Sequence, residues 1–243
     1  MSVTPTCSVA LDDIGGNLAA IRARLDHAAR AAGRDPGAIR LIAVSKTFGL
    51  DSVRAAAAHG QMDFGENRVQ EALQKIDASA ELRVRWHLIG HLQSNKARKA
   101  ANGFAAIHSV DSVELLRRLD DSAAELGTRP EILVQVDLAG EATKHGAPPD
   151  EARRIVDVAL GCRAARLTGL MLLPPWLEDP EQVRPYFARL RGFRDELLAS
   201  GVDPGALREL SMGMSHDFEV AIEEGATMVR VGTAIFGRRT PYV

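Results

Sequence analysis

One lysine, Lys46, stands near the end of an apolar stretch early in the chain, LIAVSKT at 41–47. A strand ending in an amine can present it at the edge of a sheet, and an amine that is partly shielded from water can attack a carbonyl group. The alternative is a lysine that simply ends a strand and points to solvent. Its position alone does not decide between the two.

Two segments rich in small and hydroxyl residues stand near the other end of the chain, SMGMS at 211–215 and RVGTAIFG at 230–237. Ser215 is predicted to cap the helix that follows it, while Gly232 and Thr233 offer a bare amide and a hydroxyl after the last strand. Such turns bind phosphate groups. Ordinary helix capping and tight packing are the alternatives for Ser215 and Gly232, respectively.

The strand that precedes Gly232 carries a charge, Arg230. Arg230 lies on the same face of this strand as Met228. We therefore expect its side chain to point toward the enclosed side of the sheet. A buried guanidinium needs an acceptor, which is either a carboxylate or an aromatic ring nitrogen. An amine nucleophile and a phosphate cradle together suit a phosphorylated aldehyde, and the expected cofactor is pyridoxal 5′-phosphate (PLP). An arginine beside the ring nitrogen of PLP would make the ring a weaker electron sink.

The elements that must position these residues follow from periodicity. Short apolar runs alternate with helical periods, which indicates successive βα units. Strands are predicted at 39–46, 62–66, 86–90, 106–110, 131–138, 166–173, 209–213 and 228–235, and helices near 14–33, 51–59, 67–78, 94–101, 112–126, 149–160, 180–200 and 216–224. These favour an α/β fold, a closed (β/α)8 TIM barrel, because closure leaves no strand edge. An open doubly wound sheet is the alternative, but its glycine-rich loop is missing after the first strand.

The length and composition of the chain exclude several classes of protein. A chain of 243 residues fits one barrel domain, here 1–243. Its formal charge of −2 and pI near 6.4 provide no long-range attraction to nucleic acid or to a membrane. The first residues lack a secretory signal, and Cys7 and Cys162 have no metal-ligand or disulfide pattern. We expect a cytoplasmic protein.

Seven segments resemble one known family in the correct order. They are AVSKT (43–47), FGENRVQEA (64–72), WHLIGHLQSNK (86–96), GLM (169–171), RPYF (184–187), LSMGMSHDFEVAI (210–222) and RVGTAIFG (230–237). The chain is similar to the pyridoxal phosphate homeostasis proteins, the YggS/PROSC family, over nearly its whole length after about residue 10.

This resemblance implies a fold-type III PLP-binding barrel similar to the amino-terminal domain of alanine racemase, without that enzyme's carboxyl-terminal β domain. It places PLP as an internal aldimine (a Schiff base) on Lys46, the phosphate near Ser215 and the Gly-Thr pair, and the ring nitrogen near Arg230. Asn67 is expected near the ring, although capping of the next helix explains it equally well. The expected cofactor-binding residues are Lys46, Asn67, Met212, Ser215, Arg230, Gly232 and Thr233.

Three positions depart from the family pattern. His91 stands where proline is frequent, Asp137 where asparagine is usual, and His145 where a small residue often precedes glycine. None is expected to touch the aldimine or the phosphate, and their roles stay open. His87 and His91 are four residues apart, but on a strand and its loop they do not align as they would on a helix, so no metal site is predicted.

Two classes of function compete, with a third behind them. A racemase needs an acid or base on each face of the substrate carbon, and in racemases of this fold one is a tyrosine on an additional domain. Here the chain ends directly after the eighth strand, and Tyr186 lies in a predicted outer helix. We therefore expect a non-catalytic, monomeric PLP-binding protein, with PLP-dependent apoenzymes as possible recipients. The alternatives are an alanine-racemase-type enzyme and a lysine-dependent aldolase without PLP.

Overall fold

The computed structural model of the protein describes residues 11–140 and 145–237. The predictions for Cys7 and for the end of the chain after residue 237 lie outside the described residues. None of the helices in the described parts combines the length and apolar character needed to cross a bilayer. Burial raises the pKa of Cys162 to about 11, so this thiol stays protonated and unreactive near neutral pH.

Strands and helices alternate along the chain. The strands are β1 (Arg40–Val44), β2 (Asp63–Glu66), β3 (Arg85–Leu88), β4 (Ala106–Val110), β5 (Glu131–Val136), β6 (Arg166–Leu172), β7 (Glu209–Met214) and β8 (Met228–Val231). The helices are α1 (Leu11–Ala31), α2 (Leu50–Ala58), α3 (Val69–Asp77), α4 (Ala97–Gly103), α5 (Val113–Leu126), α6 (Pro149–Ala159), α7 (Arg184–Ala199), α8 (Phe218–Glu223) and α9 (Thr233–Phe236). Short 3-10 helices span Pro36–Ala38, Ser94–Lys96, Pro180–Val183 and Pro204–Leu207.

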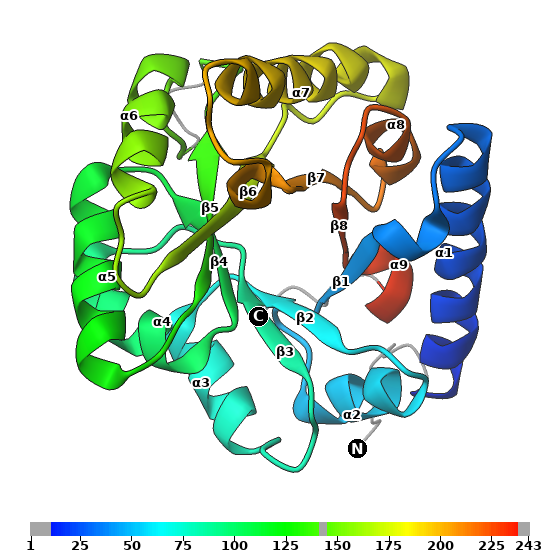
Figure 1. Ribbon diagram of the computed structural model, residues 1–243. Coiled ribbons are helices and arrows are strands. Elements are labelled where there is room, and N and C mark those ends of the chain that lie inside the picture. Colours follow the sequence, from blue (N-terminus) through cyan, green and yellow to red (C-terminus); the bar gives the residue numbers. More distant parts are fainter. Residues whose placement is uncertain (1–10, 141–144, 238–243) are drawn as a thin grey trace.

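The eight strands form a closed parallel barrel in sequence order, with β8 pairing back onto β1. Figure 1 looks into this barrel and shows the helices around its outside. The predicted TIM barrel is thus confirmed, and the open-sheet alternative is wrong. Closure follows from the sequence pattern, because strands that are apolar on both faces need cover from helices outside and from one another inside.

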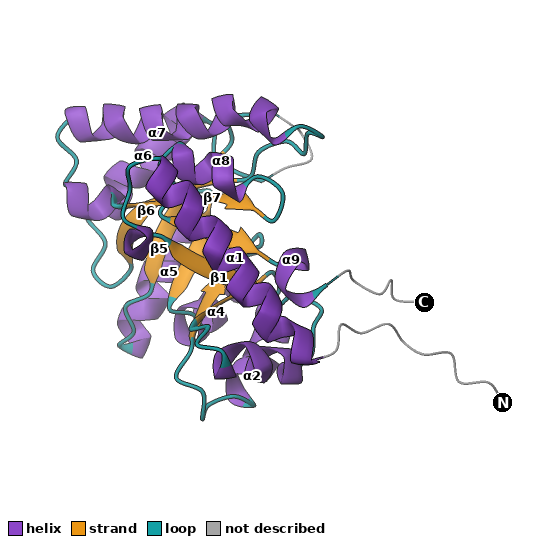
Figure 2. Ribbon diagram, turned by 90° about the vertical axis from the view of Figure 1, so that its right-hand side faces the viewer, coloured by secondary structure: helices purple, strands orange, loops and turns teal. Residues whose placement is uncertain are grey.

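Local signals set the helix ends. Ser112 caps α5 by accepting a hydrogen bond from the amide of Leu115 at 3.2 Å, and Gly127 ends the helix with a φ of +67°. The first helix, predicted near 14–33, is α1, which crosses the outside of the barrel in Figure 2. Asn17 on α1 donates a hydrogen bond to the carbonyl oxygen of Ile235 in α9 at 2.9 Å. The first helix therefore holds the end of the last βα unit.

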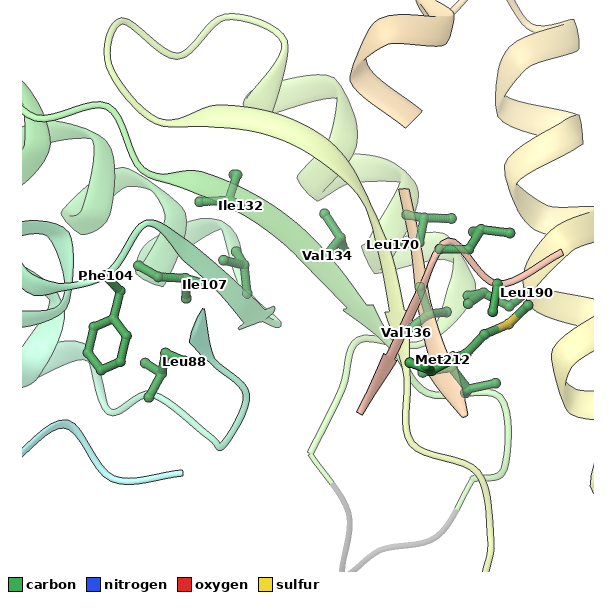
Figure 3. Packing of buried hydrophobic residues seen from close by; sticks show 14 of the residues in the cluster. Leu88, Phe104, Ile107, Ile132, Val134, Val136, Leu170, Leu190 and Met212 are labelled. Atoms are coloured by element: carbon green, nitrogen blue, oxygen red, sulfur yellow. The ribbon is translucent and has the colours of Figure 1, made fainter. Parts of the chain in front are cut away.

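The hydrophobic core has two layers. The larger layer lies between the outward face of the strands and the helices, and Figure 3 shows part of it, including Val134, Leu170 and Met212. A small inner cluster fills the barrel with Ile42, Leu133, Met171 and Met228. Strand parity decides which layer a residue joins, because successive side chains point to opposite faces.

The last strand is shorter than predicted. The apolar run suggested a strand over 228–235, but β8 ends at Val231, and Thr233–Phe236 forms α9. Gly232 separates the two, with a φ of −120° and a ψ of −75°, which is neither strand nor helix. This glycine therefore turns the chain into a helix at the carboxyl end of the barrel.

Candidate functional site

A pocket of about 400 Å³ lies at the carboxyl ends of the strands. Barrel enzymes place their chemistry at this end. Among the residues that line it are Lys46, Asn67, Met214, Ser215, Arg230, Gly232 and Thr233. The structure thus brings together every predicted site residue except Met212, from the first, second, seventh and eighth βα units.

Lys46 sits on a tight turn directly after β1. The next residue, Thr47, is in the left-handed region with a φ of +71°, which is uncommon for a residue with a branched side chain. Its amide donates a hydrogen bond to Oε1 of Glu71 on α3 at 2.9 Å. A strained backbone at this point needs support from its surroundings, and Glu71 supplies part of it.

A buried ion pair supports the other side of the turn. Nζ of Lys75 lies 2.7 Å from Oε1 of Glu66 and donates to the backbone carbonyl of Ser45 at 2.9 Å. The hydroxyl of Ser45 donates to the same carboxylate oxygen at 2.7 Å. Burial raises the pKa of Glu66, while the charge of Lys75 opposes that rise. The cluster therefore fixes the backbone of Ser45, the residue before Lys46.

This cluster was missed from the sequence. Glu66 belongs to the FGEN segment and Lys75 lies on α3, nine residues later. Lys75 looks like an ordinary charge in the last turn of a helix, where cations are favourable and usually solvated. Only the packing of α3 against the barrel shows that it is buried.

Arg230 points into the barrel, as strand parity predicted. It is 3% exposed, and it donates hydrogen bonds to Oγ of Ser211 at 2.6 Å and to the carbonyl oxygen of Leu172 at 2.8 Å. Burial lowers the pKa of Arg230 to about 10, and the nearby Asp217 opposes this. Within the described residues no carboxylate forms an ion pair with it, so the predicted alternative of a salt bridge is wrong. The guanidinium stays charged near neutral pH.

Two turns near the other end of the chain meet at this pocket, one after β7 and one after β8. Oγ of Ser215 accepts a hydrogen bond from the amide of Gly232 at 3.2 Å. A Cβ on Gly232 would lie 3.2 Å from the carbonyl oxygen of Val44, so a larger residue would press on β1. The two turns therefore present the hydroxyl of Ser215, held by the Gly232 amide, and the exposed Thr233 to one pocket, which is the chemistry of an anion site.

The prediction that Ser215 caps the helix is wrong. Helix α8 starts at Phe218 and its N-cap is Asp217, whose carboxylate accepts a hydrogen bond from the amide of Met214 at 2.6 Å. The carboxylate thus turns back onto the loop, and burial raises its pKa. Ser215 lies three residues before the start of the helix. Its side chain binds the turn after β8 instead.

Asn67 lines the pocket and does not cap α3. The N-cap of that helix is Arg68, which makes no side-chain capping hydrogen bond. The backbone of Asn67 packs tightly on Gly90. A Cβ added to Gly90 would lie 2.4 Å from the carbonyl oxygen of Asn67. Of the two explanations for Asn67, the structure favours a place at the pocket.

Comparison with known proteins gives the family. The family model described as "Alanine racemase, N-terminal domain" matches residues 16–240 of this chain. A pyridoxal phosphate homeostasis protein of Aquifex aeolicus is 42% identical over 222 residues, covering 91% of this chain and 96% of that protein. One from Pseudomonas aeruginosa is 43% identical over 233 residues, covering 94% and 97%. The chain belongs to the pyridoxal phosphate homeostasis protein family.

A solved structure of the same kind supports this assignment. PipY of Synechococcus elongatus PCC7942, determined with PLP bound, is 41% identical with a TM-score of 0.82. The match covers 92% of this chain and all of PipY. The barrel described here is therefore the complete fold of that relative, and the resemblance seen in the seven sequence segments is confirmed.

One residue expected at the cofactor from the family resemblance lies elsewhere. Met212 is fully buried in the outer core layer, where Figure 3 shows it with Leu190 of α7. Its neighbour Ser211 faces the barrel interior, so parity turns Met212 outward. Met214, two residues further along, lines the pocket instead. The choice of Met212 as a pocket residue is therefore corrected to Met214.

A chain of buried hydrogen bonds runs from Arg230 toward the amino-terminal end of the barrel. Ser211 Oγ lies 2.8 Å from His108 Nδ1, and His108 Nε2 lies 3.0 Å from His87 Nδ1. His87 Nε2 then lies 2.8 Å from the carboxylate of Asp63. Because that carboxylate only accepts, each neutral ring must donate toward Asp63 and accept from the Arg230 side. The chain therefore fixes the Ser211 oxygen as an acceptor for the guanidinium.

These interior histidines make stability depend on pH. Burial lowers the pKa of His87, and it lowers that of His108 well below its usual value. The folded protein keeps the rings neutral while the unfolded chain binds protons below about pH 6.5, so stability is present above that pH and lost as pH falls. We expect a loss of up to about 1.4 kcal/mol per pH unit for each histidine.

Urea unfolding at several pH values between about 7.5 and 5 checks this expectation, a range in which most carboxylates stay ionised. His108→Gln should be less stable at neutral pH but should show a shallower pH dependence, because one of the two groups no longer titrates. Identical slopes for the parent and the variant would exclude His108 as a source of the effect.

Proposed function

We propose that this protein binds PLP reversibly in the Lys46 pocket and takes part in PLP homeostasis in the cell. The observation that carries the proposal is one pocket lined by a lysine amine, a buried guanidinium and the paired Ser215–Gly232 turns. The names of its relatives and the PLP bound to PipY support it. Under this proposal Lys46 forms the covalent link to the cofactor.

The residues present fit PLP. Lys46 supplies an amine for its aldehyde, and the hydroxyls of Ser215 and Thr233 suit its phosphate, with the amide of Gly232 holding the Ser215 oxygen. The pocket volume of about 400 Å³ is in the usual range for sites of small ligands. When bound, PLP withdraws electrons from the carbon attached to its imine nitrogen. Under this proposal Arg230 donates to the ring nitrogen and keeps its own proton, which weakens this withdrawal.

We further propose that the protein has little or no turnover of its own. A charged Arg230 at the ring nitrogen favours holding the cofactor over stabilising a carbanion. Tyr186, considered from the sequence, lies on α7 and packs against the outer core, and it is not among the residues lining the pocket. The homeostasis names of the relatives agree with this reading.

Exchange of the α-proton of alanine into deuterated water tests the absence of turnover. With PLP-loaded protein we expect the signal of that proton, followed by NMR, to persist as long as it does with free PLP. Rapid exchange that disappears in Lys46→Ala would instead support the racemase alternative. Slow exchange leaves the binding role as the better description.

Loss of the phosphate contacts should weaken PLP selectively. In Ser215→Ala/Thr233→Ala we expect the affinity for PLP to fall at least about 100-fold, since each hydrogen bond to a charged group contributes about 1.5–3 kcal/mol. Unphosphorylated pyridoxal serves as the matched control ligand, and its affinity should change by less than about threefold, because it does not use the cradle. Equal losses for both ligands, measured by fluorescence titration, would argue against these turns as the phosphate site.

A further inference from the structure

Two histidines and an aspartate meet at the carboxyl-terminal rim of the barrel, at the ends of three consecutive strands. His91 follows β3, Asp111 directly follows β4, and His145 lies between β5 and α6. One potential ligand atom from each residue lies within 4.8 Å of the others. The two imidazole rings stack with centroids 3.6 Å apart, and Nδ1 of His91 lies 3.3 Å from Oδ2 of Asp111.

Buried polar side chains hold both histidine-bearing loops in place. Ser109, on the fully buried part of β4, donates a hydrogen bond at 2.7 Å to the carbonyl oxygen of Gly90, the residue before His91. Gln135 on β5 is 2% exposed and donates to the carbonyl oxygen of His145. Two backbone hydrogen bonds of 2.8 Å tie Ala147 to β5 and its end. The two histidines thus stand on anchored backbone, as ligands of a built site do.

We propose that His91, Asp111 and His145 bind a divalent transition-metal ion of the zinc class. Two imidazole nitrogens and one carboxylate oxygen are the ligand set of zinc sites that keep a position open, and of related iron, cobalt and manganese sites. Magnesium and calcium prefer oxygen ligands throughout, so the histidines select against them. His91 also lines the Lys46 pocket, so the ion would lie at its edge.

Binding requires a small movement of the rings. Stacked imidazoles within 9° of parallel direct their nitrogens side by side, and one ring must turn about its side-chain bonds for both to meet one ion. Both histidines are exposed, so the turn breaks their mutual stacking and leaves the buried core undisturbed. The prediction of no metal site was based on the spacing between His91 and His87. His87 is buried in the interior hydrogen-bond chain. The partner of His91 is 54 residues away in sequence, since 145 − 91 = 54.

Calorimetric titration of the full chain with Zn²⁺ tests the proposal, and Co²⁺ absorbance reports the coordination. We expect one site whose affinity falls at least about tenfold in His91→Ala and in His145→Ala, the loss that follows even from removing a residue that orients a ligand. Co²⁺ should give visible bands of a low-coordinate site that disappear in the double variant. His145→Phe separates coordination from packing, because it keeps a ring against His91 and removes the ligand.

His27→Ala on α1 is the matched control, an exposed histidine away from the rim, and it should bind Zn²⁺ as the parent does. Circular dichroism identifies any variant that does not fold, and His145→Phe then replaces His145→Ala. Binding of equal strength in the parent and in His91→Ala/His145→Ala would overturn the proposal, as would parent protein that binds Mg²⁺ more tightly than Zn²⁺. Loss of PLP binding bears on neither outcome, because none of the three ligands is assigned to the cofactor.

Discussion

Lys46→Ala is expected to abolish covalent attachment of PLP. Lys46 is the lysine that lines the pocket, and without its amine the aldehyde has no nucleophile on the pocket wall. Protein mixed with PLP should lose its visible absorbance after gel filtration, and borohydride treatment should fix no PLP on the peptide that contains residue 46. The expected change is from about one covalent PLP per chain to none.

Lys99→Ala on α4 is the matched control, because Lys99 is exposed and is not among the residues that line the pocket. It should retain the full absorbance. An unchanged visible band in Lys46→Ala would reject Lys46 as the attachment point. A colourless parent protein that still condenses with sugar phosphates would revive the aldolase alternative, since that reaction needs the amine but not PLP.

Lys75→Met is expected to destabilise the fold by about 3–5 kcal/mol, the usual cost of leaving one partner of a buried ion pair without compensation. Lys75 is 8% exposed and Glu66 fully buried, so the remaining carboxylate cannot reach water. The backbone carbonyl of Ser45 also loses its donor. Urea unfolding gives the free energy, and PLP affinity should fall as well, because this cluster supports the turn that carries Lys46.

The double variant Glu66→Gln/Lys75→Met provides the internal control. With both charges removed the destabilisation should be smaller than in Lys75→Met alone, because a neutral amide is easier to bury than an unpaired carboxylate. Lys99→Met, at an exposed site, should change the free energy of unfolding by less than about 0.5 kcal/mol. A double variant no more stable than Lys75→Met would show that lost packing, and not the unpaired charge, causes the effect.

Some residues could be assigned to the pocket from the sequence because their signals are local. Lys46 ends an apolar run, so its place at the carboxyl end of a strand follows from the run alone, and Arg230 follows from parity along β8. The alternation of strands and helices likewise indicated a barrel, since each strand can be recognised from a few neighbouring residues. Predictions of this kind need no knowledge of what lies across the structure.

Other assignments depended on contacts between distant segments. Met212 and Met214 are equally apolar and two residues apart, so in a regular strand both would point to the same face. The register of β7 shifts between Ser211 and Met214, where Gly213 has a φ of +90°, so Met212 lies in the outer core and Met214 lines the pocket. Ser215 has the residue type of a helix cap, yet the tertiary fold brings the amide of Gly232 to it. Asp217 occupies the N-cap position, and its carboxylate binds the amide of Met214 in the loop, so the type of residue alone could not distinguish these roles.

The amino-acid sequence by itself determined the barrel, the strand order and the place of Lys46 and Arg230 at its carboxyl-terminal end, because periodicity and parity act over a few residues. Only the tertiary structure decided which polar groups are buried together. The interior chain through His87 and His108 and the rim cluster of His91 with His145 join separate βα units, and the Glu66–Lys75 pair of the second unit holds Ser45 of the first. Burial changes the energy of a charged or polar group, and burial is a property of the packed barrel.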